Sequence, residues 1–87
     1  LIARARNQLG ETFQNQPDVE AAIRHTIAST LLTLGESRAA AEEARRALDL
    51  RGAHLGENAK ETLESLILLA RTRQARDQLP EARALLE

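Results

Sequence analysis

The sequence predicts an all-α fold made of antiparallel helix pairs, because its composition and its few helix breakers both favour this class. Alanine and leucine dominate the hydrophobic residues, which make up 43% of the chain, whereas Phe13 alone supplies the 1% of aromatic residues. This composition favours helices, since strands are rich in β-branched and aromatic side chains. With 87 residues, the chain is long enough for one domain with a modest core.

Four glycines and two prolines divide the chain into segments of helical length. Five helices are expected between these breaks, over residues 1–9, 18–34, 37–54, 58–76 and 80–87. The first helix ends at Gly10, which tolerates the left-handed conformation beyond a helix end, and a polar loop follows. Asp18 then caps the second helix through its side-chain oxygen, and Gly35 ends that helix.

The last two predicted helices begin with different start signals. Asn58 and Glu61 have the spacing of a capping box, in which each side chain bonds the other residue's backbone N–H. Pro80 suits a first helical position, because its φ is fixed and it has no N–H to leave unpaired. Two antiparallel pairs are therefore expected, 18–34 with 37–54 and 58–76 with 80–87.

The apolar pattern differs among the three central helices. The second helix has one apolar stripe within about 80°, formed by Ile23, Ile27, Leu31 and Leu34. The third has a stripe of small residues that lets a partner helix approach closely, formed by Ala40, Ala44 and Ala47. In the fourth, the consecutive residues Leu66 to Leu69 point almost all round the axis, so neighbours on several sides are expected.

Most charged side chains are expected to be solvated. Glu42 and Glu43 precede Arg45 and Arg46 at three- and four-residue spacings, which suits ion pairs on a helix surface. The arginines of the fourth helix spread over about 160° on a helical wheel and are interspersed with acidic residues, so they indicate ordinary surface charge.

An internal repeat relates the two halves of the chain. A shift of 42 residues superposes the segment 35–40 on 77–82 and Ile27-Ala28 on Leu69-Ala70. A Leu-Gly-Glu triplet also recurs, at 9–11 and at 55–57, four residues out of phase with this shift. An internal period of this length indicates a stacked helical array.

These residues resemble the tetratricopeptide repeat in its long form, which has a period near 42 residues and occurs in kinesin light chains and many bacterial proteins. The matching positions are Ile27-Ala28, Leu31, Gly35, Ala40, Ala47 and Leu48, and then Leu66, Leu69-Ala70, Ala82 and Leu86. The segment 51–63 is similar to the linker of the long form. The chain departs from the family at Arg24 and Ala44, where aromatic residues are favoured, at Ala59-Lys60, Arg73 and Asp77.

The resemblance implies a fragment of a right-handed solenoid forming one domain over residues 1–87. Residues 1–10 would end a preceding repeat, 18–57 would form a complete helix pair, and 58–87 a second, truncated pair. The second half of the chain also resembles repeat arrays that follow the kinase domain in some bacterial serine/threonine protein kinases. Apolar residues at the ends, Leu1, Ile2, Leu85 and Leu86, are then expected to promote self-association.

Several function classes are disfavoured by the residues themselves. A net charge of −1 and the lack of a set of aromatic residues for stacking on bases argue against a nucleic-acid partner, and the longest apolar run is too short to span a membrane. There is no cysteine, and a zinc site at His54 and Glu57 would need two further ligands, so no metal or cofactor is expected. His25 and Ser29 share a helix face but have no third group to orient the ring, so no enzyme activity is expected.

The resemblance therefore implies a non-catalytic, cytoplasmic scaffold that binds a protein or peptide in a concave groove and is part of a larger protein. The groove residues it implies are His25, Ser29, Leu32, Thr33, Glu64, Leu68, Arg71 and Gln74. The alternative is a spacer or self-association segment that positions a catalytic domain, such as a kinase domain, elsewhere in the parent chain.

The expected ligand is an extended or helical peptide with an apolar anchor and an acidic group for Arg71. Ile67 and Leu68 would receive the anchor unless they pack within the stack, which would leave a shallower and more polar groove. The carboxylate clamp of the chaperone-binding branch uses lysine and asparagine where this chain has His25, Ser29 and Leu68, so that ligand is not expected.

Overall fold

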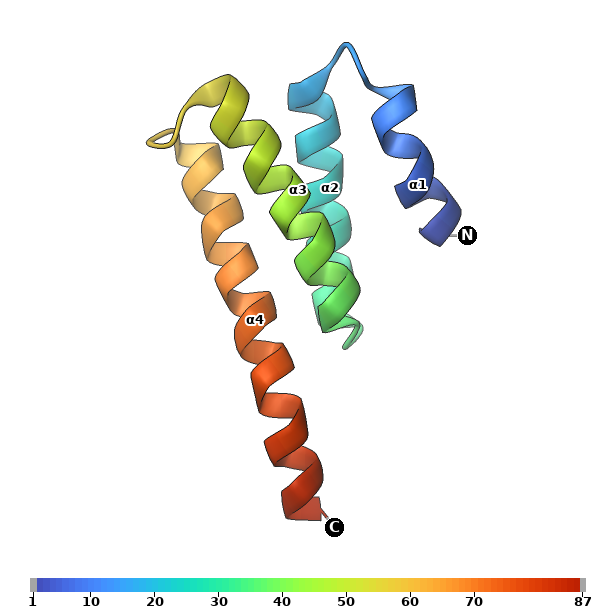
Figure 1. Cartoon of the computed structure of the whole chain (residues 1–87), viewed down its shortest axis with the longest axis vertical. Coiled ribbons are helices and arrows are strands. Elements are labelled where there is room, and N and C mark those ends of the chain that lie inside the picture. The colour runs from blue at the N-terminus through green and yellow to red at the C-terminus, as the bar shows by residue number, and fades with distance from the viewer. Residues whose placement is uncertain (1, 87) are drawn as a thin grey trace.

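The computed structural model describes the backbone of residues 2–86 and the side chains of residues 3–77. Four helices and no strand occur in this part of the chain: α1 (Ile2–Thr12), α2 (Pro17–Thr33), α3 (Ser37–Leu55) and α4 (Lys60–Leu86). They run alternately up and down, so that successive helices are antiparallel (Figure 1). The all-α prediction is confirmed, and so is the antiparallel pairing of the helices predicted at 18–34 and 37–54.

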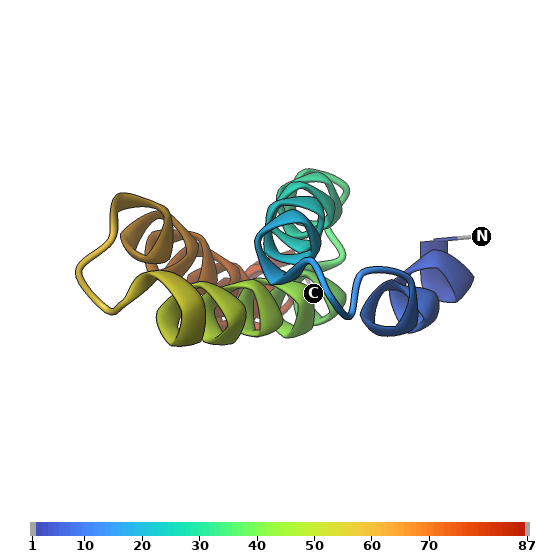
Figure 2. The same cartoon turned by 90° about the horizontal axis from the view of Figure 1, so that it is seen from above.

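The central helix of the fold is α3. It packs extensively against both α2 and α4, whereas α2 and α4 meet over a short stretch and α1 touches α2 only slightly. Viewed from above, α2 lies over α3, with α4 and α1 on opposite sides of this pair (Figure 2). The apolar core therefore lies where α2, α3 and α4 converge.

Small residues let the core helices approach closely. The core cluster consists of Ala28, Ala41, Ala44, Leu68 and Leu69, with Leu32 and Leu48 packed against it. The predicted alanine stripe of α3 is fully buried, as expected for a close contact between helices. Leu68 and Leu69 are the buried members of the consecutive run in α4, while Leu66 and Ile67 are exposed. The run is therefore covered on one side, and the expectation of neighbours on several sides is wrong for these residues.

The buried face of α2 is rotated from the predicted stripe by about 70° at 100° per residue. The residues buried on this helix are Glu20, Ala21, Arg24, Ala28 and Leu31. Ile23 and Ile27 are only half-buried, and Leu34 is exposed. The rotation turns Glu20 and Arg24 inward, where they meet a buried acid of α3.

The predicted break at Pro80 is absent, so the prediction of a fifth helix is wrong. α4 is one helix from Lys60 to Leu86, and the segments 58–76 and 80–87 do not form an antiparallel pair. The chain does reverse at Gly35 and Gly56, which have φ values of +85° and +93°. Residues 77–79 contain no glycine. An internal proline removes one backbone hydrogen bond and costs about 3 kcal/mol, but it does not by itself turn the chain back.

The other predicted helix ends shift by a few residues. α1 continues through Gly10 to Thr12, and the backbone N–H of Phe13 still donates to the Leu9 carbonyl at 3.0 Å. α2 begins with Pro17 as a first helical residue, so Asp18 lies in the first turn instead of at the N-cap, where its charge still favours the helix dipole. α4 begins at Lys60, so Asn58 lies in the preceding turn and the predicted capping box is not formed.

Gly35 ends α2 in a Schellman motif. Its N–H donates to the Leu32 carbonyl at 3.1 Å, and the N–H of Glu36 donates to the Leu31 carbonyl at 2.8 Å. This arrangement requires the positive φ of Gly35, which a residue with a Cβ adopts only under strain.

Replacing Gly35 by alanine should lower the free energy of unfolding by about 1 kcal/mol, because of that strain. The matched control is Gly52→Ala inside α3, where an added Cβ also meets open space but the backbone is helical. That change should raise the free energy of unfolding by about 0.5–1 kcal/mol. Urea denaturation followed by circular dichroism measures both, and equal effects of the two variants would contradict the assigned role of Gly35.

Candidate binding groove

A polar cluster from three helices lies at the base of the predicted groove between α2 and α4. His25 Nδ1 on α2 lies 3.2 Å from the hydroxyl of Ser65 on α4 and 3.3 Å from Nη1 of Arg51 on α3. The same Arg51 nitrogen donates to Ser65 Oγ at 3.0 Å and to the Glu61 carbonyl at 3.1 Å. Since Arg51 can only donate, Nδ1 of His25 accepts and the imidazole is neutral.

The pKa of His25 is lowered from its usual value of 6.5. Burial is the main cause, because it disfavours the charged imidazolium, and the positive charge of Arg51 adds to it. The carboxylate of Glu64 acts in the opposite direction. The cluster therefore holds a neutral histidine that links α2, α3 and α4.

The eight predicted groove residues are not equally accessible. The exposed members are Ser29, Thr33, Glu64, Arg71 and Gln74. His25 and Leu32 are half-buried, and Leu32 packs against the core. Leu68 is only 6% exposed and belongs to the core, so its assignment to the binding wall is wrong. It is buried because α3 covers the side of α4 that carries Leu68 and Leu69.

The hydroxyl groups on the α2 wall are partly used within the helix. Thr26, Thr30 and Thr33 each donate to the carbonyl four residues earlier, at 3.0–3.1 Å. Their oxygen atoms can still accept a hydrogen bond from a ligand, but their protons are occupied. The α2 side of the groove is thus shallow and mostly polar, with Ser29 exposed on it.

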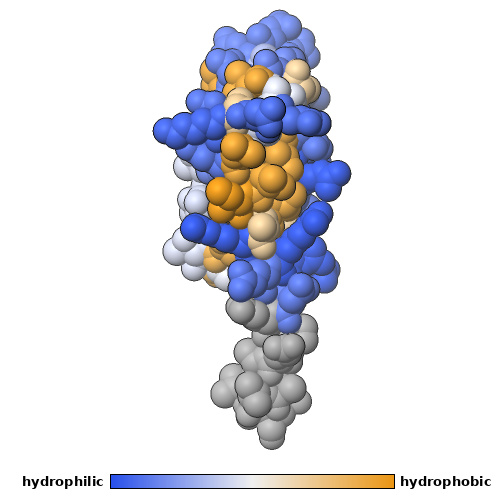
Figure 3. Space-filling model, turned by 90° about the vertical axis from the view of Figure 1, so that its left-hand side faces the viewer, coloured by the Kyte–Doolittle hydropathy of each residue, from blue (hydrophilic) through white to orange (hydrophobic). Residues whose placement is uncertain are grey.

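The outer face of α4 carries an exposed apolar surface, which we call the α4 patch and define as Leu63, Leu66 and Ile67. Ile67 is 56% exposed, and Leu63 and Leu66 are exposed to a similar extent. Figure 3, which views the molecule from the α4 side, shows an apolar area bordered by hydrophilic residues. Sequence reasoning found Ile67 but not the other two leucines. The signal for Leu66 was the apolar run itself, which is too wide for one neighbouring helix to cover, whereas Leu63 lies outside that run.

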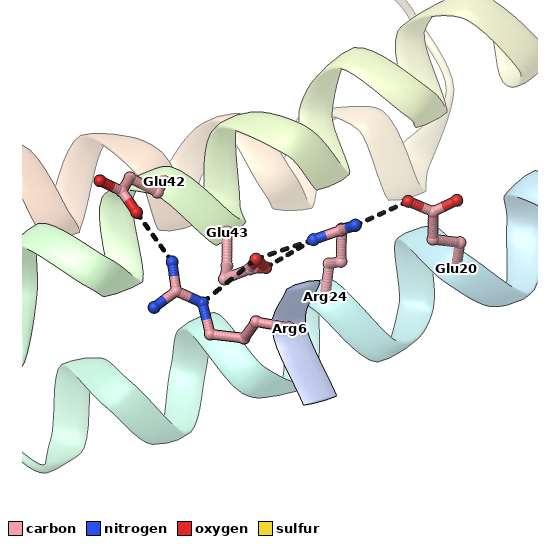
Figure 4. A network of polar contacts seen from close by, with 5 residues as sticks. All are labelled: Arg6, Glu20, Arg24, Glu42 and Glu43. Carbon is pink, nitrogen blue, oxygen red and sulfur yellow. Dashed lines mark hydrogen bonds and ion pairs between the residues drawn. The ribbon is translucent and has the colours of Figure 1, made fainter. Parts of the chain in front are cut away.

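A buried ion network links the first three helices and was not predicted from the sequence (Figure 4). Arg24 is 3% exposed and donates from Nε to Glu20 at 2.7 Å and from Nη1 to both carboxylate oxygens of Glu43 at 2.8 Å. Glu43 is fully buried. Arg6 on α1 contacts Glu42 at 2.7 Å, and its Nε lies 3.4 Å from Glu43. The network therefore joins α1, α2 and α3.

The predicted surface pairs within α3 are wrong. Glu42 and Glu43 pair with arginines of other helices, while Arg45 pairs with Asp49 at 3.3 Å on the exposed surface. Sequence spacing alone assigned these glutamates to neighbours on the same helix. The departure from the family pattern at Arg24, where an apolar residue was expected, was the one signal of a buried charge.

The remaining candidate sites are not assembled. His25 contacts Ser65, not the Ser29 of the suggested pair, and His54 lies exposed in the last turn of α3. Among the side chains of residues 3–77, no three histidine, aspartate or glutamate residues converge to hold a metal ion. Within the described chain, no helix has the length and apolar character that a bilayer span requires. The side chains of Leu1, Ile2, Leu85 and Leu86, which were expected to promote self-association, lie outside the described residues.

Replacing Arg24 by methionine should lower the free energy of unfolding by about 3–5 kcal/mol, because Glu43 would keep a buried charge without its main partner. The double variant Arg24→Leu/Glu43→Leu should be more stable than Arg24→Met, since it removes both charges together. Thermal unfolding followed by circular dichroism measures these effects. The control Arg45→Ala, at an exposed pair, should change the stability by at most about 0.5 kcal/mol. A similar loss in the Arg24 variant and in this control would contradict a buried network.

The free energy of unfolding should fall as the pH is lowered from about 7 through 6.5, because the unfolded chain binds a proton at His25 before the folded chain does. Below the lowered folded pKa, both states bind the proton and this contribution stays constant. His25→Asn should remove this part of the pH dependence, and Glu64→Gln should extend it to lower pH. Urea titrations between about pH 5 and 7 test both variants. If the free energy of unfolding of His25→Asn falls with decreasing pH as steeply as that of the wild type, other groups cause the pH dependence.

Comparison with known proteins found no matching family model, no similar curated protein and no similar solved structure. The resemblance to the tetratricopeptide repeat therefore rests on the residues and the 42-residue spacing of the sequence itself. For function, the structure offers exposed polar side chains on α2 and α4 and an exposed isoleucine of α4.

Proposed function

We propose that this chain is a non-catalytic protein–protein interaction scaffold of the tetratricopeptide type, which binds a peptide or protein in the groove between α2 and α4. It would form part of a right-handed solenoid in a larger bacterial, cytoplasmic protein. The antiparallel α2–α3 pair and its close alanine contacts support the repeat architecture. The observation that best supports binding is the α4 patch, in which Ile67 is 56% exposed and Leu63 and Leu66 are exposed as well.

Exposed apolar side chains that lie together, as in the α4 patch, favour a docking role. Arg71 lies four residues after Ile67 and is exposed, so the two side chains share one side of α4. Glu64 and Gln74 extend this side along the helix, and Ser29 is exposed on α2. A ligand with one apolar anchor and one acidic group would satisfy both Ile67 and Arg71.

Leu68 is buried beneath the binding surface and does not contact a ligand there. Because it belongs to the core, replacing it with a charged residue would unfold the domain and would not report on binding. Ile67 is the suitable position for an apolar-to-charged change, since its side chain already lies largely in solvent.

Selection from a displayed peptide library should yield ligands whose affinity depends on this side of α4. Ile67→Asp and Arg71→Glu should each weaken binding of the selected peptides by about tenfold, which corresponds to about 1.4 kcal/mol. The matched control is Arg46→Glu, an exposed position on α3. Binding is measured by isothermal titration calorimetry, and circular dichroism checks that each variant is folded.

Two outcomes would contradict the proposal. If Arg46→Glu abolishes binding while the Ile67 and Arg71 variants bind normally, the partner uses another surface. If no peptide is selected and the chain forms dimers that Ile67→Asp dissociates, the self-association role is favoured instead. Sedimentation of the wild type and of Ile67→Asp separates these cases.

A further inference from the structure

A second groove lies between α3 and α4, and its two ends differ in chemistry. At one end is a hollow of about 680 Å³ with apolar residues from both helices. Leu48, Gly52, Ala53, Leu63 and Leu66 line it, together with the polar residues Asp49, Glu57, Asn58 and Thr62. At the other end, a hollow of about 390 Å³ has Ala41 and Leu69 at its base and four arginines around it, Arg38, Arg45, Arg73 and Arg76.

The two hollows form one trough along the helices. On α3, the lining residues from Arg38 to Ala53 recur at three- and four-residue spacings, so they lie on one face of the helix. On α4, Leu63, Leu66, Arg73 and Arg76 form the opposite wall. At 1.5 Å per residue, the stretch of α3 is about 22 Å long, which matches a helix of about 15 residues.

The positive charge at one end of the trough favours an acidic partner. Among the described side chains, Arg38, Arg73 and Arg76 form no ion pair, and Arg45 makes only an exposed pair with Asp49 at 3.3 Å. Glu42, which also lines this hollow, is already paired with Arg6 of α1. Asp77 lies beside Arg73 and Arg76, so the end retains an excess of positive charge. An apolar ligand would leave these arginines without a counter-charge, whereas an acidic segment would neutralise them.

The shape of the trough favours a helix over an extended strand. Small residues, Ala41, Gly52 and Ala53, line it, and they let the backbone of a third helix approach α3. Leu48, Leu63 and Leu66 offer contacts for apolar side chains spaced at three and four residues on such a helix.

We infer that the α3–α4 trough binds an amphipathic helix of a partner protein, with apolar side chains against Leu48, Leu63 and Leu66 and acidic side chains against the four arginines. This surface differs from the α2–α4 groove of the proposed function, because its walls are formed by residues of α3 and α4. Ile67 and Arg71 do not line it.

The probes are two synthetic 16-residue helical peptides. One carries leucines in its N-terminal half and glutamates in its C-terminal half, and the other has the two halves exchanged. At least one should bind with a dissociation constant below about 100 μM at low salt. Its affinity should fall as the salt concentration rises, because the arginine contacts are exposed. Chemical-shift changes should concentrate at Leu48, Gly52 and Leu66.

A charge exchange tests the arginine end directly. The double variant Arg73→Glu/Arg76→Glu should weaken binding of the glutamate peptide by at least about tenfold. A peptide with lysine in place of glutamate should bind this variant better than it binds the wild type. Both positions are exposed, so the variant should remain folded. Arg46→Glu is the matched control, because it reverses a charge at an exposed position of α3 that does not line the trough, and it should bind the glutamate peptide as the wild type does.

Four results would overturn the inference. The first is that neither peptide binds, and the second is that the wild type and the charge-reversed variant bind the glutamate peptide equally well. Binding that is lost in Ile67→Asp and kept in the arginine variant would assign the peptide to the α2–α4 side. A wild-type dimer that dissociates on Leu66→Ser and excludes the peptides would assign the trough to a second copy of this chain.

Discussion

The buried carboxylate of Glu43 constrains how the first three helices fit together. A charge without water is strongly destabilised unless a partner faces it with good geometry, and Arg24 provides two hydrogen bonds from one nitrogen. This contact forms at only one rotation of α2. The same rotation places Ala28 in the core and leaves Ile23 at the edge. The ion pair thus defines the orientation of α2, whereas burial of the alanines and leucines supplies most of the attraction.

Local chemistry made part of this fold predictable. Gly35 and Gly56 end helices because of backbone conformation, and the alanine stripe of α3 is buried because small residues permit close packing. The buried Arg24 was not predictable, since amphipathic analysis assigns charged residues to the surface and only the tertiary partner on α3 makes burial tolerable. Nor could the sequence distinguish Leu68 from Ile67, because their burial depends on where α3 crosses α4. Pro80 was misleading because a proline without a neighbouring glycine does not reverse the chain.

The position of α4 at the edge of the fold explains its unusual surface. One side packs against α3 and α2, and the remaining sides stay open, so that Leu63, Leu66 and Ile67 are exposed on a helix that also contributes to the core. The two flanks of this helix therefore differ in chemistry. Toward α2, a neutral histidine contacts a serine hydroxyl of α4. Toward α3, leucines give way to arginines along the helix axis.

The weak attachment of α1 means that this helix can detach at a lower free-energy cost than the separation of α2 from α3. This helix is held mainly through Arg6 and the buried Leu9, and it makes few contacts with α2. If α1 detaches, Glu43 keeps its hydrogen bonds to Arg24, so the opening does not leave a buried charge unpaired. Separation of α2 from α3 breaks that pair and has a much larger free-energy cost. Backbone amides of α1 will thus exchange with solvent through a local event, while those of α2 and α3 exchange only when the three-helix core opens.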